Sequence, residues 1–236
     1  MQRITIGDLR LNQCILEIIY PKGYRYWDVC GQCILEIASA TKDELDFHQL
    51  RAAEECVLVF KKYPRARATF GYRHMTLSAG YLKNVVLFKE KAPLIFNVVR
   101  SQLDIGHLDR VGLRFTYVFP TDTSEMAEDI VNSIGVFEVA VERLQGFGSK
   151  VDSISPTIVV SDGEAKVNIR ISSAIRQRPV GMPSTPEDDE YAPEHCVLID
   201  LDFFKEHVDP KDLDLERFIH GCQKKVKENL ETLLHQ

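Results

Sequence analysis

The stretch RVGLRFTYVF, residues 110–119, decides the fold, because its apolar and polar side chains alternate with the period of a β-strand. One face collects the apolar side chains Val111, Leu113, Phe115, Tyr117 and Phe119. The other face carries Gly112, Arg114, Thr116 and Val118. A strand with one apolar and one wet face is typical of an antiparallel sheet packed on a single core.

Strand patterns recur along the chain on both sides of this stretch. We expect strands over 11–20, a meander through the β-prone runs at 69–79, 84–89 and 92–99, and further strands over 154–161, 165–173 and 195–203. Asp162-Gly163 between two of these runs indicates a hairpin. Residues 56–60 are too short to assign by periodicity alone.

Helical patterns lie between the strands. Residues 24–40 place Trp27, Cys30, Ile34 and Ile37 on one helix face, and 43–51 is a second, shorter helix pattern. After Pro120, Asp122 and Glu125 resemble a capping box, followed by an apolar stripe from Met126 through Phe137 and Val141 to Leu144, with Gly135 as a point where the helix ends or kinks. Residues 210–236 predict a long closing helix. The fold class is therefore α+β, a mainly antiparallel sheet covered by helices.

The chain is expected to form a single domain over 1–236. ILEIIYP at 15–21 and LRFTYVFP at 113–120 are both strands that end at a proline before a helix pattern. One interpretation is two diverged strand-helix-meander halves, 1–108 and 109–236, and the other is a chance match. Residues 177–195 hold four prolines and an acidic cluster, which predicts a mobile surface loop.

Composition narrows the function classes. The net charge of -6 lacks the basic footprint of a nucleic-acid binder, so nucleic acid is an unlikely partner, and the basic, aromatic stretch at 61–74 is better explained as an exposed turn. No apolar run reaches the length of a membrane span, and the N-terminus lacks the pattern of a signal peptide. Six cysteines without secretion signals predict reduced thiols, hence a cytoplasmic location. No cofactor is expected.

Several landmarks resemble one protein family. The Arg-x-Gly-Leu-Arg strand at 110–114, the Asp-x-Asp strand in VLIDLDFF at 197–204, the closing helix and the opening strand around Glu17 are similar to a sporadically distributed family of uncharacterised bacterial proteins of about this length. This sequence departs from the family at Tyr117-Val118, where the family tends to have an Asn-Arg pair. The resemblance implies the same architecture in a bacterial protein and brings no activity with it.

Two carboxylates are the main chemical candidates. Asp200 and Asp202 alternate on a strand and so project to one face, where Glu17 joins them only if its strand lies alongside. Such a group could hold a divalent cation or act as acid and base. The alternative, which we favour, is an ion network with Arg110, Arg114 and Arg170, which are also candidate binding residues.

The Cys30-x-x-Cys33 spacing suits a redox pair or half of a zinc site, but no second pair completes either site, so two small core side chains are the favoured interpretation. Nucleophile elbows and phosphate loops are absent from the sequence. The leading hypothesis is a non-catalytic binding or regulatory protein, with a protein partner or self-association. The alternatives are a metal-dependent hydrolase or nuclease using Asp200, Asp202 and Glu17, and a small-ligand carrier.

Overall fold

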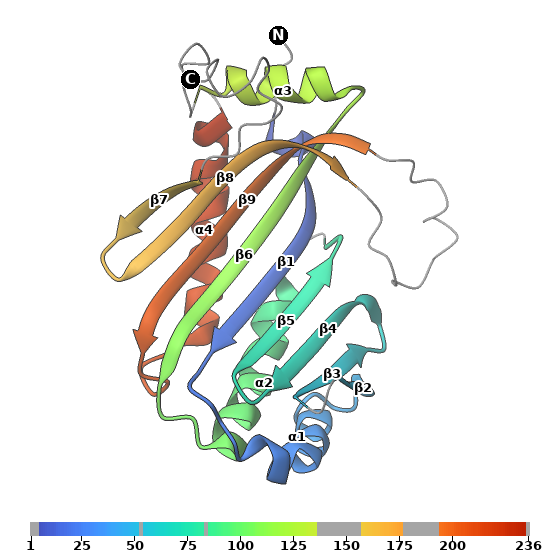
Figure 1. Cartoon of the computed structure of the whole chain (residues 1–236), viewed down its shortest axis with the longest axis vertical. Helices are drawn as coiled ribbons and strands as arrows, with labels where there is room; N and C mark the ends of the chain where they lie inside the picture. The colour runs from blue at the N-terminus through green and yellow to red at the C-terminus, as the bar shows by residue number, and fades with distance from the viewer. Residues whose placement is uncertain (1–4, 52–53, 83–84, 136–156, 177–193, 235–236) are drawn as a thin grey trace, which may run out of the picture.

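The computed structural model describes residues 5–51, 54–82, 85–135, 157–176 and 194–234. Within these residues one nine-stranded sheet is accompanied by four α-helices (Figure 1). All neighbouring strands are antiparallel. The predicted α+β class, with an antiparallel sheet covered by helices, is confirmed.

The strand order is β2-β3-β4-β5-β1-β6-β9-β8-β7. The strands are β1 (Arg10–Ile19), β2 (Leu45–Arg51), β3 (Glu55–Phe60), β4 (Tyr63–Gly71), β5 (His74–Gly80), β6 (Leu108–Thr121), β7 (Thr157–Asp162), β8 (Ala165–Arg176) and β9 (Glu194–Val208).

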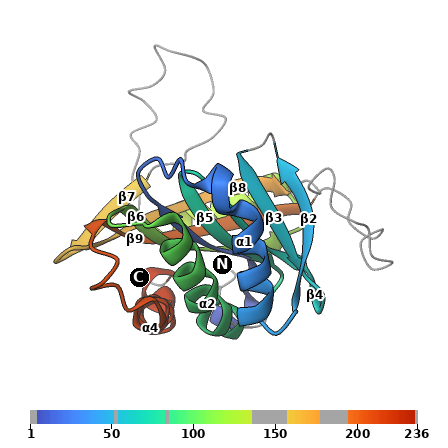
Figure 2. The same ribbon diagram turned by 90° about the horizontal axis from the view of Figure 1, so that it is seen from below.

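Three of the helices lie side by side on one face of the sheet (Figure 2). The helices are α1 (Tyr26–Ala40), α2 (Val86–Leu103), α3 (Ser124–Ser133) and α4 (Leu215–Leu234), with a short 3-10 helix at Ile6–Asp8. On this face, which we call the covered face, α1 contacts α2, and α2 contacts α4. The remaining helix, α3, lies across the ends of β6, β8 and β9 (Figure 1). The opposite face carries none of the described helices, and we call it the open face.

The two parts of the chain follow the same order of elements. The first runs β1, α1, the meander β2 to β5, and α2; the second runs β6, α3, the meander β7 to β9, and α4. In each part the last strand of the meander returns to pair with the first strand, and β1 pairs with β6 at the seam. The two central strands thus carry both halves of the sheet.

The core forms where the apolar faces of the central strands meet the helices. Cys14, Leu16 and Ile18 of β1 lie opposite the apolar face of β6, and all three are fully buried. The alternation predicted for β6 is therefore present, with its odd-numbered residues from Val111 onward facing the helices. Burying these side chains contributes roughly 1.5–3 kcal/mol each.

Two sequence-based assignments are wrong. Residues 45–51, predicted as helix, form the edge strand β2, because pairing with β3 supplies backbone hydrogen bonds that a short helix pattern could not outweigh. The runs 84–89 and 92–99, predicted as two strands, fall almost entirely within the single helix α2 (Val86–Leu103). Its buried side chains recur at spacings of three and four, and Pro93 is accommodated inside the helix.

Smaller differences concern helix faces and ends. In α1 the buried face is Tyr26, Cys33 and Ile37, whereas Trp27 is 50% exposed. The N-cap of α3 is Thr123, whose hydroxyl accepts a hydrogen bond from Met126 N, instead of the predicted Asp122. The apolar stripe at Phe137, Val141 and Leu144 and most of the predicted loop at 177–195 lie outside the described residues.

Candidate functional site

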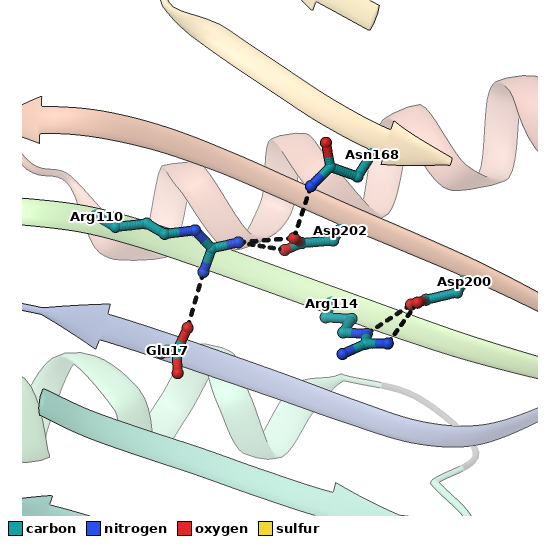
Figure 3. Close-up of polar contacts among 6 residues, drawn as sticks. All are labelled: Glu17, Arg110, Arg114, Asn168, Asp200 and Asp202. Atoms are coloured by element: carbon teal, nitrogen blue, oxygen red, sulfur yellow. Dashed lines mark hydrogen bonds and ion pairs between the residues drawn. The ribbon is translucent and has the colours of Figure 1, made fainter. Parts of the chain in front are cut away.

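On the open face the candidate acids lie together with Arg110 and Arg114, over the neighbouring strands β1, β6, β9 and β8 (Figure 3). Antiparallel pairing places Asp202 opposite Arg114 on one side and opposite Asn168 on the other. Glu17 lies opposite Gly112. The strand of Glu17 is therefore next to that of the arginines, which is the condition under which it could join the cluster.

Arg110 is the central cation of this cluster. Its Nη1 donates to Glu17 Oε2 at 2.9 Å, and its Nη2 donates to both oxygens of Asp202 at 2.7 Å. Asn168 Nδ2 donates to Asp202 Oδ2 at 3.2 Å. The guanidinium also lies over the ring of Phe204, 5.0 Å from its centroid. One arginine thus joins β1 of the first half to β9 of the second.

Gly112 makes room for this arrangement. A Cβ at Gly112 would lie 2.8 Å from Cζ of Arg110, because the arginine side chain folds flat over that position. Any larger residue would push the guanidinium away from Glu17 and Asp202. The Arg-x-Gly spacing in the sequence is therefore explained by the path of a side chain, with no special backbone conformation required.

Arg114 and Asp200 form a second pair. Arg114 Nε and Nη2 donate to the two oxygens of Asp200 at 2.6 and 2.5 Å. The Asp200 side chain is 7% exposed, whereas that of Arg114 is 46% exposed. Hydrogen bonding to Asp200 raises the pKa of Arg114 above its usual value. The buried carboxylate holds a fixed positive charge at the surface of the open face.

These contacts confirm the predicted ion network for Arg110 and Arg114, but Arg170 is engaged differently. Its Nε and Nη2 both donate to Thr157 Oγ1 at 3.2 Å, on the neighbouring strand β7. In the described part of the chain, no three His, Cys, Asp or Glu side chains are arranged to hold a metal ion. The cluster is built to neutralise the carboxylates with arginine.

The cysteine pair, Cys30 and Cys33, lies on α1. Cys33 is fully buried and burial raises the pKa of its thiol to about 12; the same holds for Cys56 on β3. A reactive or metal-binding cysteine requires a lowered pKa and access to solvent. The environment of Cys33 therefore favours the structural interpretation of the pair.

A groove lies on the covered face, beside α4. Its floor is the apolar side of β7, β8 and β9, with Val160, Val167 and Ile169, and its wall is α4, with Leu230 and Leu233. This hollow has a volume of about 550 Å³. A second hollow lies next to it along α4, and we call the two hollows together the α4 groove.

The second hollow continues the first along α4 toward the start of the helix. It has a volume of about 400 Å³ and contains Phe218, and both hollows are lined by Ala165, Phe203 and Lys225. The α4 groove therefore runs along the helix from Arg217 to Leu233, roughly 24 Å at the rise of an α-helix.

Sequence reasoning did not find the α4 groove. In the sequence, Val167 and Ile169 alternate with polar residues, and the apolar stripe of the closing helix contains Leu230 and Leu233. Neither pattern says which element covers that face. The available signal was that Phe218 and Leu233 are apolar residues of α4 outside its buried stripe.

No described helix is long and apolar enough to cross a membrane. No family model matches the chain, and no curated protein is significantly similar to it. Membership of the bacterial family that the sequence resembles therefore stays a proposal, and the site must be interpreted from its own geometry.

Proposed function

We propose that this chain is a non-catalytic binding protein that takes a partner macromolecule into the α4 groove. The observation that carries the proposal is the groove itself, an elongated apolar surface between α4 and the end of the sheet. Contiguous exposed apolar surface of this kind typically marks an interaction site. Val160, on the floor, is 46% exposed.

The open face is a weaker candidate for a binding site than the α4 groove. It is a weaker candidate still for the active site of a hydrolase. Asp200 and Asp202 are each held by two charge-assisted hydrogen bonds from arginine, and Glu17 by one. A divalent cation at these oxygens would have to displace or approach the guanidinium groups, which repel it. The metal-dependent alternative thus requires a rearrangement of the whole network.

A small-ligand carrier is the second candidate. The larger hollow, at about 550 Å³, falls within the range of roughly 300–1,000 Å³ typical of small-molecule pockets. Its apolar lining would suit an apolar ligand. Its continuation along α4 favours an elongated partner over a compact ligand.

The test uses two neighbouring valines on β7. Val160 faces the groove, while Val159 is on the open face and is 57% exposed. Val160→Asp places a carboxylate on the apolar floor, and Val159→Asp places the same group on the same strand facing the other way. Each variant and the parent would be isolated from the protein's own cell and measured by native mass spectrometry.

We expect a macromolecule to co-purify with the parent and with Val159→Asp, and to be depleted at least tenfold with Val160→Asp. A small molecule that follows the same pattern would favour the carrier. Equal retention by both variants would show that the groove is not the binding site. A divalent ion lost on Asp200→Asn would favour the hydrolase.

A further inference from the structure

We propose that the chain has a second binding site, which takes a small amphipathic anion, that is, an apolar body with one negatively charged head group such as a carboxylate. The site is a pocket on the covered face, between the C-terminal half of α4 and the connection from β5 to α2. It lies over β1 and β6, the two strands of the seam, and we call it the seam pocket. The proposal is independent of the function proposed for the α4 groove.

The seam pocket and the α4 groove lie on different sides of α4. Both are lined by Val226 and Leu230, which belong to the buried stripe of the helix. From this stripe the α4 groove extends to Asn229, whereas the seam pocket extends to Gln223 and Lys227. At 3.6 residues per turn, Asn229 points to one side of the stripe and the other two residues point to the opposite side. A ligand of the seam pocket is therefore separated from the groove by the helix.

The inner part of the seam pocket is apolar and has the size of a small-molecule site. Its volume is about 490 Å³, within the range of roughly 300–1,000 Å³ typical of such sites. Phe115 and Tyr117 of β6 contribute to the floor, and their rings stack at 6.4 Å between centroids. Phe115, Val226 and Leu230 are almost completely buried. These side chains suit the apolar body of a ligand.

Two cations lie at the open side of the seam pocket. Arg10 and Lys227 line it, and both residues are exposed. Lys224, on the same helix, pairs with Glu228 at 3.7 Å, whereas Lys227 forms an ion pair with none of the described residues. The charge of Lys227 is therefore available to a ligand whose apolar body lies on the floor.

The signs of the lining charges select an anion. None of the described residues that line the seam pocket is acidic. The α4 groove differs, because its larger hollow is lined by Asp162 and Glu228 and its smaller hollow by Asp212. A cationic ligand in the seam pocket would be repelled by the two basic side chains with no carboxylate in the lining to compensate, whereas an anionic ligand would be attracted.

The uncharged polar groups of the lining fit the same ligand. The side-chain amide of Gln223 and the hydroxyl of Tyr117 are hydrogen-bond donors. Burial raises the pKa of Tyr117 to about 12, so the phenol keeps its proton near neutral pH and remains a donor. A carboxylate accepts hydrogen bonds and carries the charge that Arg10 and Lys227 attract, so one head group satisfies both kinds of lining residue.

The experiment compares three probes that share one alkyl chain and differ in the head group: decanoate, decanol and decylammonium. Near neutral pH the first is an anion, the second is neutral and the third is a cation. Binding to the full chain is measured by isothermal titration calorimetry, below the concentrations at which the probes form micelles. We expect decanoate to bind about tenfold more tightly than decanol, and decylammonium to bind most weakly. Added salt should weaken the binding of decanoate and leave that of decanol unchanged.

Substitutions on α4 test the charges of the pocket. Lys227→Gln removes one positive charge, and Gln223→Glu adds a carboxylate of nearly the same shape as the amide. Each should weaken decanoate about fivefold or more and change the affinity for decanol by less than about twofold. Lys224→Gln is the matched control and should change neither affinity, because Lys224 is an exposed residue of the same helix outside the pocket lining. Gln and Glu are good helix formers, so all three variants should fold like the parent.

Val160→Asp shows which hollow the probe occupies, because it changes the α4 groove and leaves the lining of the seam pocket intact. We expect it to bind decanoate as the parent does. Loss of binding with Val160→Asp but not with Lys227→Gln would place the probe in the groove and overturn the inference. So would a chain that binds no decanoate, equal or tighter binding of decanol or decylammonium, or equal effects of Lys227→Gln and Lys224→Gln. Decanoate binding does not depend on whether a macromolecule co-purifies, so this proposal and the proposed function can fail separately.

Discussion

The first and second halves of this chain use the same order of elements, yet their sheets are covered to different extents. In the first half α1 and α2 both lie on the covered face, and the side chains beneath them, such as Leu58 on β3, are fully buried. Of the helices described in the second half, α4 lies on that face and α3 does not, and Val160 on the corresponding strand β7 is half exposed. The difference teaches that the helix that follows the first strand of each half can either cover the sheet face or leave apolar side chains exposed on it.

We expect the largest effect from deleting α4. Removing the residues after Lys211 deletes α4, whose buried stripe of Leu215, Ile219, Cys222 and Val226 packs on the central strands. We expect insoluble or molten protein, because a large apolar surface becomes exposed. Near-ultraviolet circular dichroism would report the loss of fixed tertiary packing, and binding of a hydrophobic dye would report the exposed apolar surface. Cooperative unfolding near the parental temperature would contradict it.

A pair of truncations compares the two floors directly. Leu58→Ala, under α1, should lower the free energy of unfolding by about 2–5 kcal/mol, since it leaves a cavity in a packed core. Val160→Ala, in the groove, should lower it by less than about 0.5 kcal/mol, because the side chain is already solvated. The free energy of unfolding of each variant would be measured by urea unfolding and compared with that of the parent. Similar losses would mean that the second half is covered after all.

The seam between the halves is tested by the ion network. Asp200→Asn with Asp202→Asn leaves Arg110 and Arg114 without their charged partners, and we expect a loss of about 1–4 kcal/mol and a lower melting temperature. Magnesium or manganese should not stabilise the parent. A more stable double variant together with a metal-stabilised parent would favour an acidic metal site.

Gly112→Ala provides a control for the network that removes no charge. Its methyl group displaces the Arg110 guanidinium from Glu17 and Asp202 and leaves Arg114 and Asp200 in place. The loss of stability should therefore be smaller than that of the double variant. An equal or larger loss would mean that Gly112 has a further role in the backbone.

The smallest expected effect concerns the thiols at the contact between α1 and the sheet. Because burial raises the pKa of Cys33 and Cys56 to about 12, these thiols stabilise the fold below the pKa of an unfolded thiol, about 8.5. That contribution is lost as pH rises from about 8.5 toward 12. At pH 8, iodoacetamide should modify the half-buried Cys30 before Cys33, as mass spectrometry of digests would show. Preferential modification of Cys33 would point to a reactive thiol.

Local patterns were sufficient where one element faces one core. The alternation of 110–119 and the stripe of α4 predicted β6 and the closing helix correctly, because burial on one side imposes a period that the sequence displays. That Asp200 and Asp202 share a face also followed from such patterns, since residues two apart on a strand point the same way, but which arginine each carboxylate binds did not. The bond from Asn168 to Asp202 likewise depends on which strands are neighbours.

Patterns failed where neighbours in space decided the outcome. Residues 45–51 form a strand because their backbone pairs with the edge of β3. Residues 86–103 form one helix because their apolar side chains pack on the sheet, and Pro93 is tolerated inside that helix. Intrinsic propensities of a few tenths of a kcal/mol per residue are easily exceeded by such packing.

The sequence by itself determined the α+β class, the central strands, the closing helix and the acids and arginines of the open face. Only the tertiary structure decided that α1 covers its half while α3 lies across the strand ends, and so that an apolar groove remains beside α4. The physical reason is that periodicity records whether a face is apolar, whereas the element that covers that face is chosen by contacts between residues far apart in the chain.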